Sequence, residues 1–363
     1  MIRFQRTLPW VVAGVLLVAN GCMAIHRPKA SLENPRAIQE AVNEDFNQAT
    51  TYVLQGDLRS ALPILKALPT YSLGATRLRL RDGLLARFTG AAAEPAPVGV
   101  DAWTANVLVA YRTYWKQTML GEQSQTLAES TLAKILAKLL NQPLDSLHPP
   151  DLDALEQPLL TELERHGYHG LLGVTRPFRE LLLWRGQTEA RYQIDLPEGR
   201  EQVTVVLLSD FASLGWLGFA TLDVYHTGGW TKPDRLFCVA QAYDTGSESF
   251  RVSYLAHEGQ HFRDNRLFPR LEQPELEYRA KLVEIALADQ TLAALLGAFH
   301  ANQSADRGQP HAFANRRLME GLSNLLPPKR AGAADGWAGL PPEEFRAAAR
   351  RLLAQDTRAL ERR

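Results

Sequence analysis

The spacing of apolar residues changes once along this chain, and that change constrains the fold more than any other feature. Between about residues 35 and 170 apolar side chains recur at helical spacing, interrupted by breaks rich in Pro, Gly and Asn. From Thr188 onwards the pattern alternates, as it does in half-buried strands. Helices first and a group of strands afterwards predict an α+β fold with a helical N-terminal region.

Four short segments in the second half read as strands. Residues 190–196 and 203–208 flank the turn residues 197–200 and predict a hairpin. Residues 218–225 and 236–240 predict two further strands, joined through the Gly-rich stretch 227–230. Together they predict a small, mostly antiparallel or mixed sheet, in which 218–225 is a candidate edge strand.

The helical region carries two local signals. The pair Gly56–Asp57 predicts the turn of a helix hairpin, and no second copy at the period of a helical repeat follows it. Aromatic residues gather on a further predicted helix, and their type predicts a role in the core. They are Trp103, Tyr111, Tyr114 and Trp115.

The segment after the last strand contains His257-Glu258-Gly259-Gln260-His261. Ser247 is a plausible N-cap for a helix through this segment, and on a helix residues i and i+4 share one face. His257 and His261 can therefore direct two imidazoles at one metal ion, with Glu258 beside them to act on a metal-bound water. The alternative is an amphipathic helix whose histidines and glutamate are structural.

This His-Glu-x-x-His pattern, with uncharged residues at its two middle positions, resembles the zinc-binding helix of zincin-type metallopeptidases. Asp264 stands where the metzincin branch has Gly and Leu267 where it has His or Asp, so the resemblance is to the gluzincin branch. It implies a catalytic Zn²⁺ with three protein ligands and one open position, and a sheet packed behind a metal-binding helix pair.

The third ligand implied by this resemblance is a glutamate on a second helix. Pro274 is well placed to begin that helix, and the run Glu277-x-x-Ala280 resembles the Glu-x-x-Ala portion of gluzincin second helices. Glu277 is therefore the preferred ligand. Glu284, two turns later on the same face, remains the alternative.

The resemblance also implies a mechanism of metal-assisted hydrolysis. Glu258 would act as the catalytic base, and a further donor would stabilise the oxyanion. His311 has the residue type and chain order of the gluzincin donor, and Tyr254 and Tyr278 are further candidates. Asp264 is a candidate to orient a ligand, or to cap the end of the helix.

The N-terminus predicts export. Arg3 and Arg6 precede the apolar run 10–19, which has the length of a signal-peptide core. The following Ala19-Asn20-Gly21-Cys22 resembles the lipobox of bacterial lipoproteins, which implies a lipid anchor on Cys22. Because Met23 follows instead of an aspartate, the resemblance favours the outer membrane, with the protein facing the periplasm. An ordinary signal peptide cut near Ala24 is the alternative.

The charge balance argues against a nucleic-acid site, and the cysteine count argues against a disulfide within the mature chain. The chain has 363 residues with 40 basic and 40 acidic side chains, so it lacks the basic surplus typical of nucleic-acid binding. With Cys22 lipidated, Cys238 has no disulfide partner and is expected to be a buried thiol. The charge balance therefore argues against nucleic acid as the main partner, and the zincin resemblance implies a peptide or protein substrate.

These signals predict a lipoprotein signal peptide (1–21), a helical region (22–175), a zincin-like metal-hydrolase domain (176–326), and a linker with a C-terminal helix (327–363). The function they predict is that of a membrane-tethered zinc metallopeptidase of the bacterial cell envelope. Two alternatives stay open. One is a non-catalytic envelope scaffold with a structural or vestigial zinc site, and the other is a zinc hydrolase of a non-protein substrate.

Overall fold

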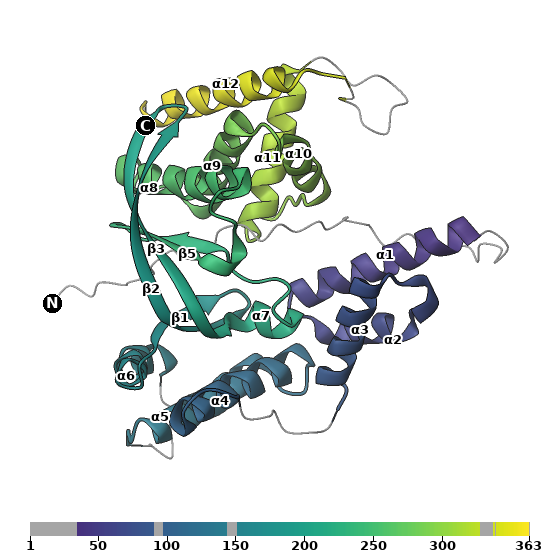
Figure 1. The fold of residues 1–363 in the computed structure, drawn as a ribbon, viewed down its shortest axis with the longest axis vertical. Helices are drawn as coiled ribbons and strands as arrows, with labels where there is room; N and C mark the ends of the chain where they lie inside the picture. Colours follow the sequence, from purple (N-terminus) through teal and green to yellow (C-terminus); the bar gives the residue numbers. More distant parts are fainter. Residues whose placement is uncertain (1–34, 91–96, 144–150, 327–336, 338, 363) are drawn as a thin grey trace. The chain divides into compact units, whose positions relative to one another are not determined.

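A computed structural model of the protein describes residues 35–90, 97–143, 151–326, 337 and 339–362 (Figure 1). The predicted signal peptide, Cys22 and most of the predicted linker lie outside these ranges. The described residues form twelve α-helices and a five-stranded mixed sheet, which confirms the predicted α+β class with its helical N-terminal region. None of these helices is long and apolar enough to cross a membrane.

Contacts within the chain divide it into two compact units. Of the described residues, those within 35–186 and 209–227 form the N-terminal unit, and those within 187–208 and 228–362 form the C-terminal unit. Two long strands, β2 (Phe178–Leu196) and β3 (Gly199–Leu214), contribute residues to each unit. The domain boundaries that the sequence predicts, after residues 175 and 326, stay predictions.

The N-terminal unit is mainly helical. Its first two helices form the predicted hairpin: Gly56 adopts φ +76°, and the Asp57 side chain caps the second helix by accepting a hydrogen bond from the backbone N–H of Ser60. The helices are α1 (Pro35–Leu54), α2 (Leu58–Ala67), α3 (Ala75–Phe88), α4 (Ala102–Met119), α5 (Gln125–Leu139) and α6 (Leu152–Arg165).

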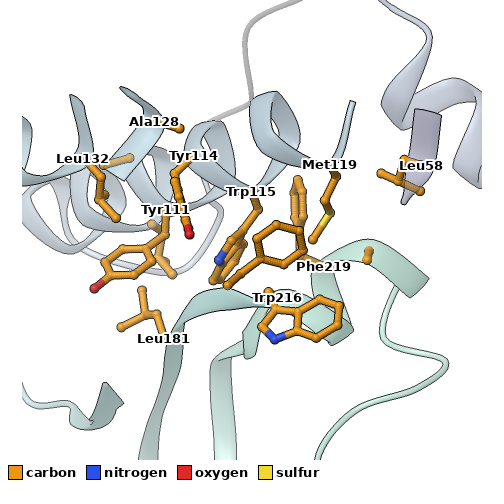
Figure 2. Packing of buried hydrophobic residues seen from close by; sticks show 14 of the residues in the cluster. Leu58, Tyr111, Tyr114, Trp115, Met119, Ala128, Leu132, Leu181, Trp216 and Phe219 are labelled. Atoms are coloured by element: carbon orange, nitrogen blue, oxygen red, sulfur yellow. The ribbon is translucent and has the colours of Figure 1, made fainter. Parts of the chain in front are cut away.

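Aromatic side chains build the core of this unit (Figure 2). Tyr111, Tyr114 and Trp115 lie on α4 and are buried, as the sequence predicts. The Trp115 ring centroid lies 5.6 Å from that of Phe219, and the Trp115 indole N–H donates to the carbonyl of Arg179. Such contacts combine a large buried apolar area with a satisfied polar edge.

The prediction of a strand at 218–225 is wrong. Residues Gly215–Thr221 form a short helix, α7, and turn residues follow it. Trp216, Phe219 and Ala220 have the i, i+3, i+4 spacing of a helix face, and all three are buried in the core. The Glu180 carboxylate accepts the backbone N–H of Trp216 and so caps the first turn. The short apolar run of this segment is compatible with a strand or a helix, and its tertiary contacts stabilise the helix.

The sheet has the strand order β1-β2-β3-β5-β4. The predicted hairpin is confirmed as β2 and β3, and both strands are longer than predicted. β1 (His169–Thr175) pairs antiparallel with β2 and was not predicted. β5 (Leu236–Val239) is confirmed and runs parallel to β3.

The edge strand nearest the predicted metal helix is β4 (Gly229–Thr231), which overlaps the end of the stretch 227–230 that the sequence assigns to a connection. It pairs antiparallel with β5, with Gly229 opposite Cys238 and Thr231 opposite Leu236. A side chain at Gly229 would overlap the carbonyl of Phe237 and the ring of Tyr254, so the close packing here requires glycine.

The C-terminal unit contains five helices preceded by a π-helical segment, and α8 contacts the strands β4 and β5. The helix α9 is buried on nearly all sides because it contacts α8, α11 and α12 (Figure 1). The predicted C-terminal helix is confirmed as α12. The elements are the π-helix Phe250–Ala256, α8 (His257–Leu267), α9 (Gln273–Leu287), α10 (Leu292–Ala301), α11 (Pro310–Leu325) and α12 (Pro342–Leu360).

Candidate metal centre

The His-Glu-x-x-His motif occupies the first turns of α8, directly after the π-helix. Ser247 lies at the start of this helical run, and its hydroxyl accepts the backbone N–H of Phe250, in agreement with the predicted cap. The π-helix widens the turn that leads into His257, and π-helical turns are enriched at functional sites. The rings of Phe250 and Tyr254 stack at 5.4 Å along it.

The structure brings His257, His261 and Glu277 together. The two Nε2 atoms lie 3.0 Å apart, and each lies 3.6 Å from an oxygen of the Glu277 carboxylate. Each side chain offers one possible ligand atom, and these three atoms lie within 4.8 Å of one another. The helices α8 and α9 therefore place two imidazole nitrogens and one carboxylate oxygen close enough together to bind one metal ion.

This donor set fits zinc. Imidazole and carboxylate are ordinary zinc ligands, and a tetrahedral site with bonds of about 2.0–2.1 Å separates its ligand atoms by roughly 3.3–3.4 Å. The observed separations of 3.0 and 3.6 Å bracket that value. The residues present thus match a three-ligand zinc site with one open position.

Glu284, the alternative third ligand, has a different partner. Its Oε1 lies 2.7 Å from Nδ1 of His257, on the ring edge opposite Nε2. A carboxylate on the second nitrogen of a ligand histidine fixes the tautomer and the ring orientation. Nδ1 of His261, by contrast, lacks a hydrogen-bond partner among the described residues. Glu277 and Glu284 therefore occupy two different positions, one beside both Nε2 atoms and one behind His257.

Glu258 is fully buried and reaches the strand β4. Thr231 Oγ1 donates a short hydrogen bond to Glu258 Oε2, and Glu258 Oε1 has no hydrogen-bond partner in the described part of the chain. Burial raises the pKa of Glu258 above its ordinary value, while the neighbouring histidines and the Thr231 hydrogen bond lower it in part. One carboxylate oxygen is thus held and the other is left available as a proton acceptor.

His311 lies at the first turn of α11, where its Nδ1 is 2.8 Å from Glu277 Oε2. Burial alone would raise the pKa of Glu277, but the charges of His311 and His261 bring that pKa well below its usual range. The side chain of His311 is 35% exposed, whereas those of His257, His261 and Glu277 are 2% exposed or less. His311 therefore lies between the buried cluster and the surface.

The other two candidate donors are placed elsewhere. The ring of Tyr254 packs against Gly229 of β4 and is fully buried. Tyr278 lies under the guanidinium of Arg317, 3.8 Å from its ring centroid, on the α11 side of α9. Of the three predicted donors, His311 is the one in contact with the cluster.

Asp264 does not orient a ligand histidine but joins the two helices. Its Oδ1 accepts from the Gln260 amide, and its Oδ2 accepts from Nε of Arg279, two residues after Glu277, at 2.8 Å. Arg279 also reaches Asp356 on α12. A buried pair of this kind fixes the spacing of α8 and α9, and removing one partner would leave an unpaired buried charge.

At Gly259 the helix α8 lies too close to its neighbour to leave room for a side chain. The Cδ1 atom of Ile194, on β2, would lie 2.8 Å from a Cβ at this position. The metal helix therefore sits directly on the sheet. Cys238 is buried, as predicted, and burial raises the pKa of its thiol to about 12, which keeps it protonated.

The sequence did not predict a role for Thr231. It predicted Glu284 as an alternative metal ligand, but not as the partner of His257. Thr231 lies 27 residues before Glu258 and belongs to no motif, so only the pairing of β4 with β5 brings it to the site. The position of Glu284, two turns after Glu277, did indicate that both glutamates face α8.

Comparisons of this chain with protein-family models, with curated proteins and with solved structures found no match.

Proposed function

We propose that this protein is a zinc-dependent peptidase with a gluzincin-like site, in which His257, His261 and Glu277 hold the metal ion. The observation that carries the proposal is the convergence of these three side chains, with the free oxygen of Glu258 beside them. A carboxylate that is buried, held at one oxygen and unpaired at the other has the features of a general base. The resemblance of the motif to zincins supports the same reaction class.

Zinc bound at this site would polarise a substrate carbonyl and lower the pKa of a bound water to about 7. Glu258 Oε1 then accepts a proton from the attacking water and passes it to the nitrogen of the leaving amine. His311, at the exposed side of the cluster, supplies a hydrogen bond to the oxyanion. Glu284 holds the ring of His257, and Thr231 holds Glu258.

The substrate and location belong to the same proposal. The basic start, apolar run and Cys22 of the N-terminus support export and lipid anchoring at the bacterial outer membrane, facing the periplasm. Peptides or proteins of the cell envelope are then the substrates within reach. The balanced charge of the chain supports a peptide or protein substrate over nucleic acid.

The first test is zinc stoichiometry. Purified protein that lacks residues 1–22 should hold close to one zinc per chain, and a His257→Ala variant should hold almost none, since half of its imidazole ligands are gone. A His169→Ala variant, altered at the start of β1 in the N-terminal unit, is the matched control and should keep its zinc. Wild-type protein without zinc after reconstitution would overturn the proposal.

The second test is turnover. A peptide-library digest should yield cleavage products with the zinc-loaded wild type, and Glu258→Gln should retain zinc but lose turnover, because an amide accepts no proton. Cleavage by the Glu258→Gln protein at the wild-type rate would remove Glu258 from the mechanism.

A second candidate function is favoured by the burial of the cluster. All three ligand side chains are 2% exposed or less, which is also typical of a structural zinc site in a non-catalytic scaffold. The digest separates the two functions. Zinc that raises the melting temperature without any cleavage of the library would favour the scaffold.

A further inference from the structure

We propose that Thr231 is a positioning residue for Glu258, selecting which of its two carboxylate oxygens faces the reacting atoms. This inference rests on the proposed function, since it concerns how the same site works. It assigns a role to the edge strand β4 beyond its place in the sheet.

The contacts around Glu258 are asymmetric. Oε2 accepts the Thr231 hydroxyl, which also lies 3.2 Å from the backbone carbonyl of Glu258, while Oε1 has no partner within the described ranges. Glu258 is 0% and Thr231 6% exposed, so bulk water does not satisfy the free oxygen. Leaving a buried carboxylate oxygen unpaired is unfavourable, and such groups in folded proteins call for a functional explanation.

A second threonine–glutamate pair in the same unit shows what a structural pair looks like. Thr291 donates its hydroxyl to Glu248 Oε1 at 2.7 Å. The same carboxylate also accepts the backbone N–H groups of Asp289, Gln290 and Thr291, so both of its oxygens are occupied. The Glu248 pair fastens a loop, whereas the Glu258 pair holds one oxygen and leaves the other available.

The strand gives Thr231 a fixed place from which to act. β4 is paired with β5, with Thr231 opposite Leu236, and the packing at Gly229 leaves no room for the strand to move inwards. A general base contributes most when its rotamer is locked by a neighbour on a rigid element. A hydroxyl is well suited to this task, because it donates a hydrogen bond without neutralising the base.

The test uses cobalt-substituted protein and acetohydroxamic acid, whose visible absorption change reports binding without any substrate. Binding of this acid in its deprotonated form would release the hydroxyl proton, which Glu258 Oε1 would accept. Thr231→Val, which removes the hydroxyl at nearly constant volume, should weaken hydroxamate affinity about tenfold, equivalent to about 1.4 kcal/mol. Thr231→Ser keeps the hydroxyl and should stay within about threefold of wild type.

Two further variants make the result specific. Thr291→Val removes the same kind of bond from Glu248, which is not a residue of the cluster, and should leave hydroxamate affinity unchanged. Thr231→Val combined with Glu258→Gln should bind hydroxamate as Glu258→Gln does, because Thr231 acts through the carboxylate. Wild-type affinity in Thr231→Val, a loss in Thr231→Ser equal to that in Thr231→Val, additive losses in the double variant, or loss of cobalt in Thr231→Val would each overturn the proposal.

The outcomes also separate this inference from the proposed function. Cobalt and hydroxamate binding that is indifferent to Thr231→Val removes the positioning role and leaves the metal site in place. Wild-type protein that binds no cobalt removes the metal site, and the role of Thr231 with it. Zinc-loaded wild type that cleaves no peptide removes the peptidase assignment while the hydroxamate measurements still decide the role of Thr231.

Discussion

The two units of this protein differ most in what they bury besides apolar side chains. Few polar side chains are buried in the described part of the N-terminal unit: Thr104, Glu180, Thr221 and Thr227. The C-terminal unit buries many, most of them on or beside α8 and α9: Glu201, Thr231, His257, Glu258, Gln260, His261, Asp264, Glu277, Arg279, Lys281, Glu284 and Asn315.

The hydrogen bonding of these buried polar groups also differs between the two units. In the N-terminal unit the Glu180 carboxylate accepts backbone N–H groups from Leu181 and Trp216. In the C-terminal unit Glu258 Oε1 and His261 Nδ1 are buried without hydrogen-bond partners among the described residues. Burying charged or unpaired polar groups costs free energy that an apolar core of similar size would not. The N-terminal unit thus buries few charged side chains, whereas the C-terminal unit buries a group of them around three possible metal ligands, as a metal site would explain.

The largest effect is expected from removing Glu277, the proposed carboxylate ligand. Glu277→Gln should reduce zinc from near one per chain to near zero, because a neutral amide is a poor zinc ligand and both histidines lose their shared partner. Metal analysis after dialysis checks this. Glu275→Gln, on the same helix in a surface ion pair with Arg307, is the control. Equal zinc content in the two variants would contradict the role of Glu277 as a ligand, and with it the metal site that distinguishes the C-terminal unit.

The N-terminal core should respond in the opposite way. Trp115→Ala should lower the free energy of unfolding by about 3–5 kcal/mol, since it opens a cavity beside Phe219 and leaves the Arg179 carbonyl without its donor. Urea denaturation measures the change, and the folded variant should still hold zinc. Tyr71→Ala, at an aromatic residue that is 86% exposed, should change stability by less than about 0.5 kcal/mol. Similar losses in both variants would contradict the assigned core.

Glu180 should make stability depend on pH. Burial raises its pKa to about 7 from 4.5, so the folded state binds the proton more tightly than the unfolded state does. The stabilising effect of this proton is complete below pH 4.5 and is lost as the pH rises to 7, a change on the order of 3 kcal/mol.

The Glu180→Gln variant isolates this group, because the amide keeps an acceptor for the Trp216 N–H but does not titrate. Urea denaturation at pH 5 and pH 7.5 should show the wild type losing more stability than the variant between the two values. A parallel response in both proteins would show that the carboxyl titrates normally.

The smallest effect is expected at Glu284, which contacts the proposed ligand His257. Glu284→Gln should weaken zinc affinity by about 10- to 100-fold, since the amide orients the His257 ring less strongly than a carboxylate does. Competition with a zinc chelator measures the change. Glu320→Gln, on the surface of α11 in an ion pair with Arg316, should bind zinc as the wild type does. An effect of Glu284→Gln as large as that of Glu277→Gln would mean that both glutamates bind the metal.

The sequence alone predicted the features that depend on local spacing. The helical N-terminal region, the β2–β3 hairpin and the Ser247 cap follow from periodicity and turn chemistry, which act over a few residues. The pairing of His257 with His261 follows from the geometry of one helix turn. The aromatic core on α4 follows from residue type.

The tertiary structure decided the features that depend on distant partners. Residues 215–221 form a helix, against the predicted strand, because their aromatic face packs into the core and Glu180 caps the first turn. Glu277 and Glu284 share a helix face in the sequence, and only the packing of α9 on α8 gives each its own place. Thr231 reaches Glu258 only because β4 pairs with β5. The free energy of such contacts comes from burial shared between segments far apart in the chain, so no local pattern records it.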